Sequence, residues 1–150
     1  IEPIIGVGAT VAGVQIRMDG GPKPARFQTG SYPEFPTDLQ SPMLSVLSLA
    51  EGESVLTETV FEARFKTAGE LVKMGADISV SGNQAMIRGR ERLSGTRVRA
   101  WDLRGGAALV AAGLAASGET VIEDCIHIER GYEDICRDFQ FLGGDICWSA

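Results

Sequence analysis

The sequence has little of what marks several specialised classes of protein. It contains no apolar run of the length needed to cross a bilayer, and its opening segment has neither a basic start nor a small-residue cleavage site. Basic residues are in the minority, with 14 Lys and Arg against 20 Asp and Glu. That balance argues against a surface for nucleic acid or anionic lipid. We therefore expect a cytoplasmic protein that binds neither nucleic acid nor membranes.

Cysteine and histidine are also scarce. The 3 cysteines, Cys125, Cys136 and Cys147, form no Cys-x-x-Cys pair, so neither a disulfide framework nor a four-ligand zinc site is predicted. We expect reduced thiols that are mostly buried. The single histidine, His127, falls in a predicted strand, where a packing role is commoner than catalysis. These residues predict no metal site, and we expect no cofactor.

An internal repeat organises the remaining sequence, whose 44% hydrophobic and 23% charged residues are typical of a globular domain. Residues 34–97 and 98–150 follow the same plan. The matched pairs are Asp38-Leu39 with Asp102-Leu103, Gly52-Glu53 with Gly118-Glu119, and Met74-Gly75 with Leu142-Gly143. Residues 1–33 are interpreted as the tail of a preceding repeat with a connector, because Val14–Arg17 resembles Ala85–Arg88. We expect one domain of about two and a half repeats.

Each repeat is predicted to hold a helix buried on every side, a strand and an amphipathic helix, and the first copy then continues into a hairpin. The second copy ends at Ala150, where the partner strand of its hairpin would begin. In the first copy the helix spans 39–50, the strand 54–60 and the hairpin 77–88, and Gly52 and Gly75 end the two helices. In the second copy the strand is predicted over 120–128. The pattern indicates a mixed α/β fold of repeated units.

The N-terminal part carries two weaker patterns. Gly6-Val7-Gly8 begins like a dinucleotide-binding loop, but Val11 stands where its third glycine belongs, so we reject that interpretation. The segment 23–36 holds three prolines and is predicted to cross the surface as extended chain.

Two aspartates stand at predicted helix starts. Asp38 and Asp102 could each be an ordinary N-cap, which accepts hydrogen bonds from free backbone N–H groups. Alternatively, a carboxylate held ionised by the helix dipole could accept a proton from a substrate hydroxyl. Asp38 is the better functional candidate, because Thr37 offers an alternative cap, and Asp102 is predicted to be structural.

Three arginines are candidates for binding an anion. Arg64 and Arg130 are each predicted to follow a strand and precede a helix, where a guanidinium suits phosphate or carboxylate. The alternative is a surface ion pair with a neighbour such as Glu62 or Glu129. Arg104 could likewise bind an anion or form a surface ion pair, and a third possibility is an ion pair with Asp102.

Four linked motifs give the chain a family resemblance. They are Tyr32–Gln40 (YPEFPTDLQ), Thr57–Phe65 (TETVFEARF), Asp102–Ala108 (DLRGGAA) and His127–Glu133 (HIERGYE). In this order they resemble the UDP-N-acetylglucosamine 1-carboxyvinyltransferase family of enolpyruvyl transferases. Glu34 and Gly105 depart from the family pattern, which has Gly and commonly Ala there.

The resemblance implies a fold of βαβαββ units, with helices inside and strands outside. It implies transfer of the enolpyruvyl group from phosphoenolpyruvate to the 3-hydroxyl of UDP-N-acetylglucosamine, the first committed step of peptidoglycan synthesis. By motif, Asp38 corresponds to the carboxylate that contacts this hydroxyl and acts as its base. Val60 and Phe61 correspond to residues bordering the nucleotide sugar, and Arg104 and Arg130 to arginines that face phosphoenolpyruvate or the closing loop.

The resemblance also implies that residues 1–150 form a fragment from the C-terminal domain of a two-domain enzyme. The other domain would supply the loop cysteine that donates a proton, and no cysteine of this sequence lies in that motif. We therefore expect the fragment alone to be inactive. Two alternatives remain: a shikimate 3-phosphate enolpyruvyl transferase and a noncatalytic repeat module.

Overall fold

The computed structural model describes residues 2–4, 13–15, 20–62 and 64–149. The rejected glycine pattern at Gly6, Gly8 and Val11 lies outside these residues, as do Ile16 and Arg17 of the N-terminal strand resemblance. The described N-terminal segments are the short strands β1 (Glu2–Ile4) and β2 (Gly13–Gln15), which pair antiparallel.

A first α/β unit covers residues 26–88. Its elements in chain order are β3 (Arg26–Gln28), the 3-10 turn η1 (Thr37–Leu39), α1 (Gln40–Leu47), β4 (Glu53–Thr57), α2 (Lys66–Lys73), β5 (Asp77–Ser81) and β6 (Gln84–Arg88). The strands form one sheet in the order β3-β4-β6-β5, in which only the β3 and β4 pair is parallel. Strand β3 lies in the segment predicted only as extended chain. The predicted hairpin is confirmed, with Gly82 and Asn83 between its strands.

A second unit covers residues 97–141. It consists of β7 (Arg97–Arg99), α3 (Leu103–Ala115), β8 (Val121–Glu123), α4 (Ile126–Glu129) and α5 (Ile135–Phe141). Strands β7 and β8 pair in parallel, as β3 and β4 do in the first unit.

The predicted strand over 120–128 is wrong in its second half. The strand ends at Glu123, Asp124 has a positive φ of 59°, and the chain then enters α4. His127 therefore lies on a short helix, and Cys125 is the residue that precedes this helix. The turn places Ile128 in a small apolar cluster with Ala100 and Val110, and burial of that side chain overrides the β-branched pattern.

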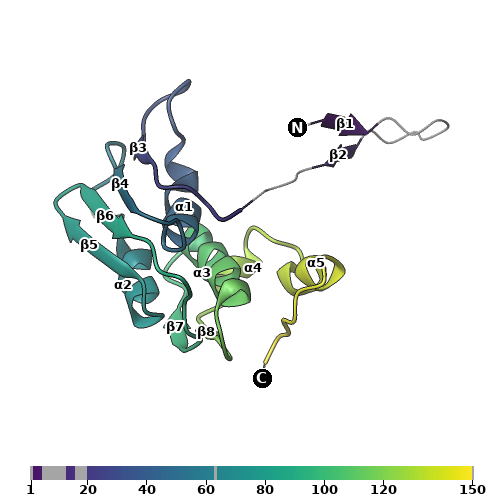
Figure 1. Cartoon of the computed structure of the whole chain (residues 1–150). Helices are drawn as coiled ribbons and strands as arrows, with labels where there is room; N and C mark the ends of the chain where they lie inside the picture. Colours follow the sequence, from purple (N-terminus) through teal and green to yellow (C-terminus); the bar gives the residue numbers. More distant parts are fainter. Residues whose placement is uncertain (1, 5–12, 16–19, 63, 150) are drawn as a thin grey trace.

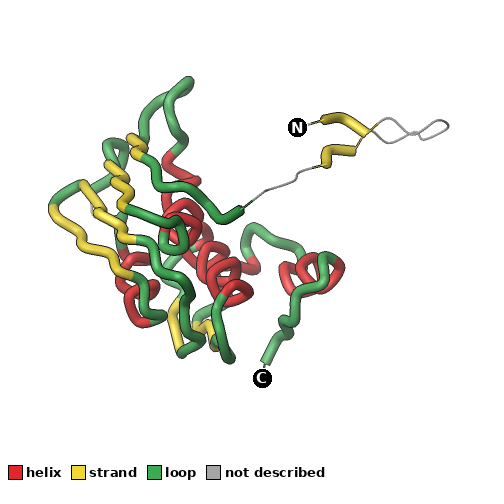
Figure 2. The backbone as a smooth tube through the Cα atoms, viewed as in Figure 1, coloured by secondary structure: helices red, strands yellow, loops and turns green. Residues whose placement is uncertain are grey.

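Helices α1, α2 and α3 form the interior, as the family resemblance implies, whereas α5 lies away from the main sheet (Figure 1). Helix α3 packs against α1 and α2, and the main sheet lies outside them (Figure 1, Figure 2). Leu44, Leu71 and Leu109 contribute fully buried side chains from these three helices. The prediction that α1 is buried on every side is wrong, because Val46 is 45% exposed.

Glycines end the helical segments as expected. Gly75 and Gly143, each with a φ of 92°, follow α2 and α5, and Gly52 and Gly118 also have positive φ. A residue with a Cβ is disfavoured in that backbone conformation, so these positions fix where each turn occurs. Within the described part of the chain, no helix is long and apolar enough to span a membrane.

Candidate functional site

The two matched aspartates have different surroundings. Asp102 is the N-cap of α3, and its Oδ1 accepts a hydrogen bond from the Gly105 N–H at 2.7 Å. Asp38 lies within η1. Pro36 is the N-cap residue of this turn, and no side chain makes a capping hydrogen bond there. The capping interpretation is therefore correct for Asp102 and wrong for Asp38.

The carboxylate of Asp38 faces two arginines, one from each unit. Its Oδ1 accepts from Arg64 Nη2 and its Oδ2 from Arg104 Nη2, both at 3.2 Å. The charge of Asp38, followed by hydrogen bonds to Asp38 and Tyr132, raises the pKa of Arg104. The side chain of Asp38 is 56% exposed, so both oxygens can still be reached by a ligand from solvent. The alternative partners proposed for Arg64 and Arg104, Glu62 and Asp102, are not the ones observed.

Arg64 is fixed more firmly than the carboxylate it contacts. Its Nη1 donates to Thr37 Oγ1 at 2.8 Å, and its guanidinium lies 4.7 Å from the centre of the Phe61 ring. A guanidinium over an aromatic face gains cation–π attraction, which adds to the two polar contacts. The side chain of Arg64 is only 21% exposed. This arginine therefore presents a positioned positive charge at the edge of the cluster.

Val60 and Phe61 lie on the loop after β4, with exposures of 44% and 54%. Large apolar side chains left open to solvent on a fixed loop are available for a ligand. The loop is tied to the Asp38 cluster through the stacking of Phe61 on Arg64. The structure thus brings Asp38, Val60, Phe61 and Arg104 to one region.

Arg130 is exposed and follows α4, so it stands at the C-terminal end of that helix instead of before a helix N-terminus. The adjacent chain contacts the start of α3. A Cβ added to Gly131 would lie 2.6 Å from Leu103 Cδ2, and Tyr132 interacts with Arg104. Arg130 therefore lies on a segment that packs beside Arg104, at the same end of α3.

Glu58 belongs to the candidate site by its contacts, although no sequence pattern singled it out. It is 1% exposed and directly follows β4, and its carboxylate accepts hydrogen bonds from Thr29, Thr37, and the backbones of Val60 and Phe61. Burial opposes its ionisation, but the four hydrogen bonds outweigh burial and lower the pKa of Glu58. The available signal was a charged residue within the strand predicted over 54–60.

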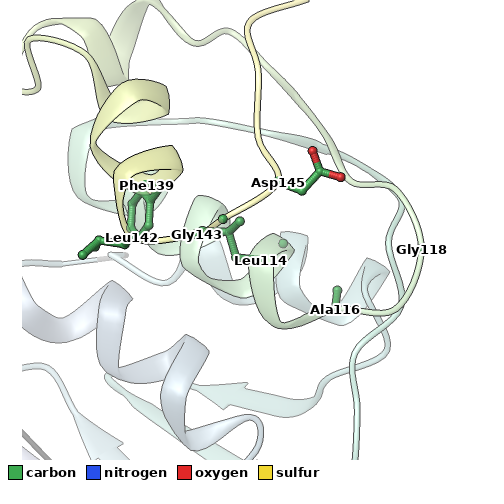
Figure 3. Close-up of a pocket in the computed structure, with 9 residues that line it drawn as sticks. Leu114, Ala116, Gly118, Phe139, Leu142, Gly143 and Asp145 are labelled. Carbon is green, nitrogen blue, oxygen red and sulfur yellow. The ribbon is translucent and has the colours of Figure 1, made fainter.

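Two hollows lie away from these residues. A cavity of about 490 Å³ lies between the C-terminal part of α3 and the chain around α5, lined in part by Leu114, Phe139 and Asp145 (Figure 3). Helical rise puts Gly113, which also lines it, about 14 Å along α3 from Arg104. None of the predicted site residues lines this cavity.

The three cysteines line a neighbouring hollow of about 630 Å³. Cys136 is buried, Cys125 partly buried and Cys147 exposed, so the prediction of mostly buried thiols holds for Cys136 alone. Burial, reinforced by nearby acidic residues, raises the pKa values of Cys125 and Cys136, which disfavours the reactive thiolates. Over the described ranges, no three His, Cys, Asp or Glu side chains are grouped to hold a metal ion.

Comparisons with known proteins support the resemblance. Residues 7–139 match the family model described as EPSP synthase (3-phosphoshikimate 1-carboxyvinyltransferase). The chain is 52% identical over 124 residues to UDP-N-acetylglucosamine 1-carboxyvinyltransferase 1 of Clostridium perfringens, a match covering 83% of this chain and 30% of that protein. It is 46% identical over 158 residues to UDP-N-acetylglucosamine 1-carboxyvinyltransferase of Desulfofundulus thermocisternus, covering 100% of this chain and 65% of the relative.

The fold also matches a solved enzyme. The structure of the enolpyruvyl transferase NikO from Streptomyces tendae aligns with a TM-score of 0.76 and 34% identity, covering 83% of this chain and 29% of NikO. The family model, the sequence identities and the structural match lead to one conclusion. The chain belongs to the EPSP synthase (3-phosphoshikimate 1-carboxyvinyltransferase) family of enolpyruvyl transferases.

Proposed function

We propose that this chain forms part of an enzyme that transfers the enolpyruvyl group of phosphoenolpyruvate to the 3-hydroxyl of UDP-N-acetylglucosamine. The observation that carries the proposal is the convergence of Asp38 with Arg64 and Arg104, which come from two units of the fold. Arginine side chains recognise carboxylate and phosphate, the two anionic groups of phosphoenolpyruvate. An accessible carboxylate between them can accept the proton of a sugar hydroxyl.

The proposed reaction is an addition followed by an elimination. Asp38 accepts the hydroxyl proton while the hydroxyl oxygen bonds to C2 of phosphoenolpyruvate, and the electron pair of the C2–C3 double bond takes a proton at C3. Breaking the bond from C2 to the phosphate oxygen, with loss of a proton from C3, restores the double bond and releases phosphate. Arg104 and Arg130 stabilise the changing negative charge.

The remaining predicted site residues bind the acceptor. Val60 and Phe61 border the nucleotide sugar with their exposed side chains. The proton added at C3 comes from a cysteine of a second domain, and this domain also carries the Lys-Asn pair near phosphoenolpyruvate. In this proposal residues 1–150 supply one side of a shared site, with 1–33 as connector and preceding repeat, and 34–97 and 98–150 as the two repeats.

The biological role follows from the reaction. We place it at the first committed step of peptidoglycan synthesis, in the cytoplasm, and through the cell wall it affects cell shape, division and the cell cycle. The names of the curated relatives support the nucleotide sugar as acceptor. The description of the family model supports shikimate 3-phosphate as the second candidate.

Phosphate release from phosphoenolpyruvate tests the proposal. In a complete polypeptide that contains this chain and the second domain, we expect release with UDP-N-acetylglucosamine and none with shikimate 3-phosphate. Residues 1–150 alone are expected to release none. Asp38→Ala in the complete polypeptide is expected to lower turnover by roughly 10²- to 10⁴-fold. Release with shikimate 3-phosphate alone would establish the second candidate, and no release with either acceptor would favour a noncatalytic module.

A further inference from the structure

Glu58 occupies an unusual position for a charged side chain. It is 1% exposed, and each carboxylate oxygen is held by partners from different segments. Oε1 accepts from Thr29 Oγ1, the Val60 N–H and the Phe61 N–H, at 2.8, 2.8 and 3.2 Å. Oε2 accepts from Thr37 Oγ1 at 2.8 Å. Because buried carboxylates need such compensation, these contacts must be kept together for the charge to be tolerated.

The partners of Glu58 lead to the two halves of the candidate site. One oxygen fixes the backbone of the loop that presents Val60 and Phe61. The other fixes Thr37, whose hydroxyl accepts from Arg64 Nη1 at 2.8 Å while Arg64 contacts Asp38. A single carboxylate therefore sets the position of the loop and, through one hydroxyl, the orientation of a site arginine.

We propose that Glu58 is a positioning residue that aligns the Val60–Phe61 loop and the Thr37–Arg64 pair for binding of the nucleotide sugar. Its role in substrate binding rests on the proposed function. Its structural part, the fixing of the loop backbone, does not. The two parts can be tested separately.

Glu70, a buried carboxylate on α2, provides a matched control. It is 4% exposed and accepts hydrogen bonds from Lys73, the Arg99 backbone and Trp101 Nε1, at 2.7, 3.0 and 3.0 Å. Neither Val60, Phe61 nor Thr37 is among these partners. A Glu70→Gln variant therefore measures the general cost of neutralising a buried carboxylate without disturbing the loop.

Amide hydrogen exchange in the full chain tests the structural part. In Glu58→Gln, we expect faster exchange at Val60 and Phe61, because a neutral amide oxygen accepts their hydrogen bonds more weakly than a charged carboxylate oxygen does. Exchange at these two amides should be unchanged in Glu70→Gln. Unchanged protection at both amides in Glu58→Gln would overturn the proposal.

Steady-state kinetics of the complete polypeptide test the binding part. Glu58→Gln should raise KM for UDP-N-acetylglucosamine roughly tenfold or more, with a smaller change in kcat and little change in KM for phosphoenolpyruvate. Glu70→Gln should leave both KM values near those of the wild type. Equal losses from both variants would contradict a positioning role.

A second variant covers the case in which Glu58→Gln does not fold. Thr37→Val keeps the volume but removes the link between Glu58 and Arg64, and we expect turnover to fall about tenfold with the Val60 and Phe61 amides still protected. Full turnover in Thr37→Val would contradict the link. If the wild-type polypeptide shows no turnover, the proposed function fails, while hydrogen exchange still decides the role of Glu58 in the loop.

Discussion

Asp38 and Asp102 occupy matched positions in the two units and do different things. The carboxylate of Asp102 accepts the Gly105 N–H and completes the start of α3. That of Asp38 makes no cap and instead contacts Arg64 and Arg104. The difference begins with the backbone: Pro36 and the 3-10 turn precede α1, whereas Asp102 is itself extended, with a φ of −158°. Two aspartates at matched positions of the repeat therefore have different contacts, and only Asp38 is left available for the proposed chemistry.

The contacts of the two aspartates are also expected to contribute differently to the stability of the fold. An N-cap side chain contributes about 1 kcal/mol, so the contact of Asp102 with the Gly105 N–H is expected to stabilise the fold by about this amount. The ion pairs of Asp38 are largely exposed, and such pairs contribute about 0–1 kcal/mol. Asp38 can therefore change its contacts when a substrate binds without a large loss of stability.

Apart from changes to Asp38 itself, the largest expected effect comes from removing the two arginines that contact its carboxylate. In the complete polypeptide, Arg104→Ala and Arg64→Ala should each lower turnover by about 10²- to 10³-fold, because both remove positive charge facing the reacting groups. Phosphate release at saturating substrate measures this. Arg88→Ala is the control, since Arg88 pairs with Glu53 and Asp77 on the neighbouring strands of the main sheet. Equal turnover in Arg88→Ala and the two site variants would contradict a special role of Arg64 and Arg104 in turnover.

The next effect concerns stability at the matched position. Asp102→Ala should lower the free energy of unfolding by about 1 kcal/mol, equivalent to roughly 2–4 °C in Tm, because the Gly105 N–H loses its partner. Asp102→Asn should retain most of the stability, since Asn is also a good N-cap. Thermal unfolding followed by circular dichroism provides the measurement. A Tm of Asp102→Ala equal to that of the wild type would mean that the cap contributes nothing.

Lowering the pH should reveal a smaller contribution to stability, that of the buried carboxylates of Glu58 and Glu70. For Glu70, as for Glu58, burial opposes ionisation but hydrogen bonds dominate and lower the pKa from its usual 4.5. Their stabilisation is therefore fully present above about pH 4.5 and is lost as pH falls through the lower folded-state values. Urea unfolding from pH 6 to pH 3 should show a shallower loss in Glu58→Gln and Glu70→Gln. Identical acid profiles in wild type and variants would contradict this.

The smallest expected effect is that of salt on the Asp38 contacts. Since these ion pairs are exposed, high salt should screen them, and the difference in Tm between wild type and Asp38→Ala should shrink towards zero near 1 M NaCl. The difference for Asp102→Ala should persist, because its lost contact is a short hydrogen bond to the backbone. Thermal unfolding at low and high salt tests both, and a persistent Asp38 difference would indicate a structural role.

Much of the fold could be predicted from sequence because repeat matching and glycine positions are local signals. Gly75, Gly143 and the 77–88 hairpin follow from such signals. The helix at His127 could not be predicted, because the turn at Asp124 and the burial of Ile128 depend on tertiary packing. The candidate site was also only partly predictable. Sequence motifs singled out Asp38 and Arg104, but only the folded chain shows that Glu58 accepts hydrogen bonds from the Val60–Phe61 loop.

The central claim, that the Asp38 carboxylate is held for chemistry and not for folding, is tested most directly by measuring turnover and Tm together in Asp38→Asn. This substitution keeps the shape of the side chain and removes its negative charge. We predict that turnover of the complete polypeptide falls at least about 100-fold while Tm stays within about 1 °C of the wild type. Near-normal turnover, or a fall in activity matched by a large fall in Tm, would contradict the claim.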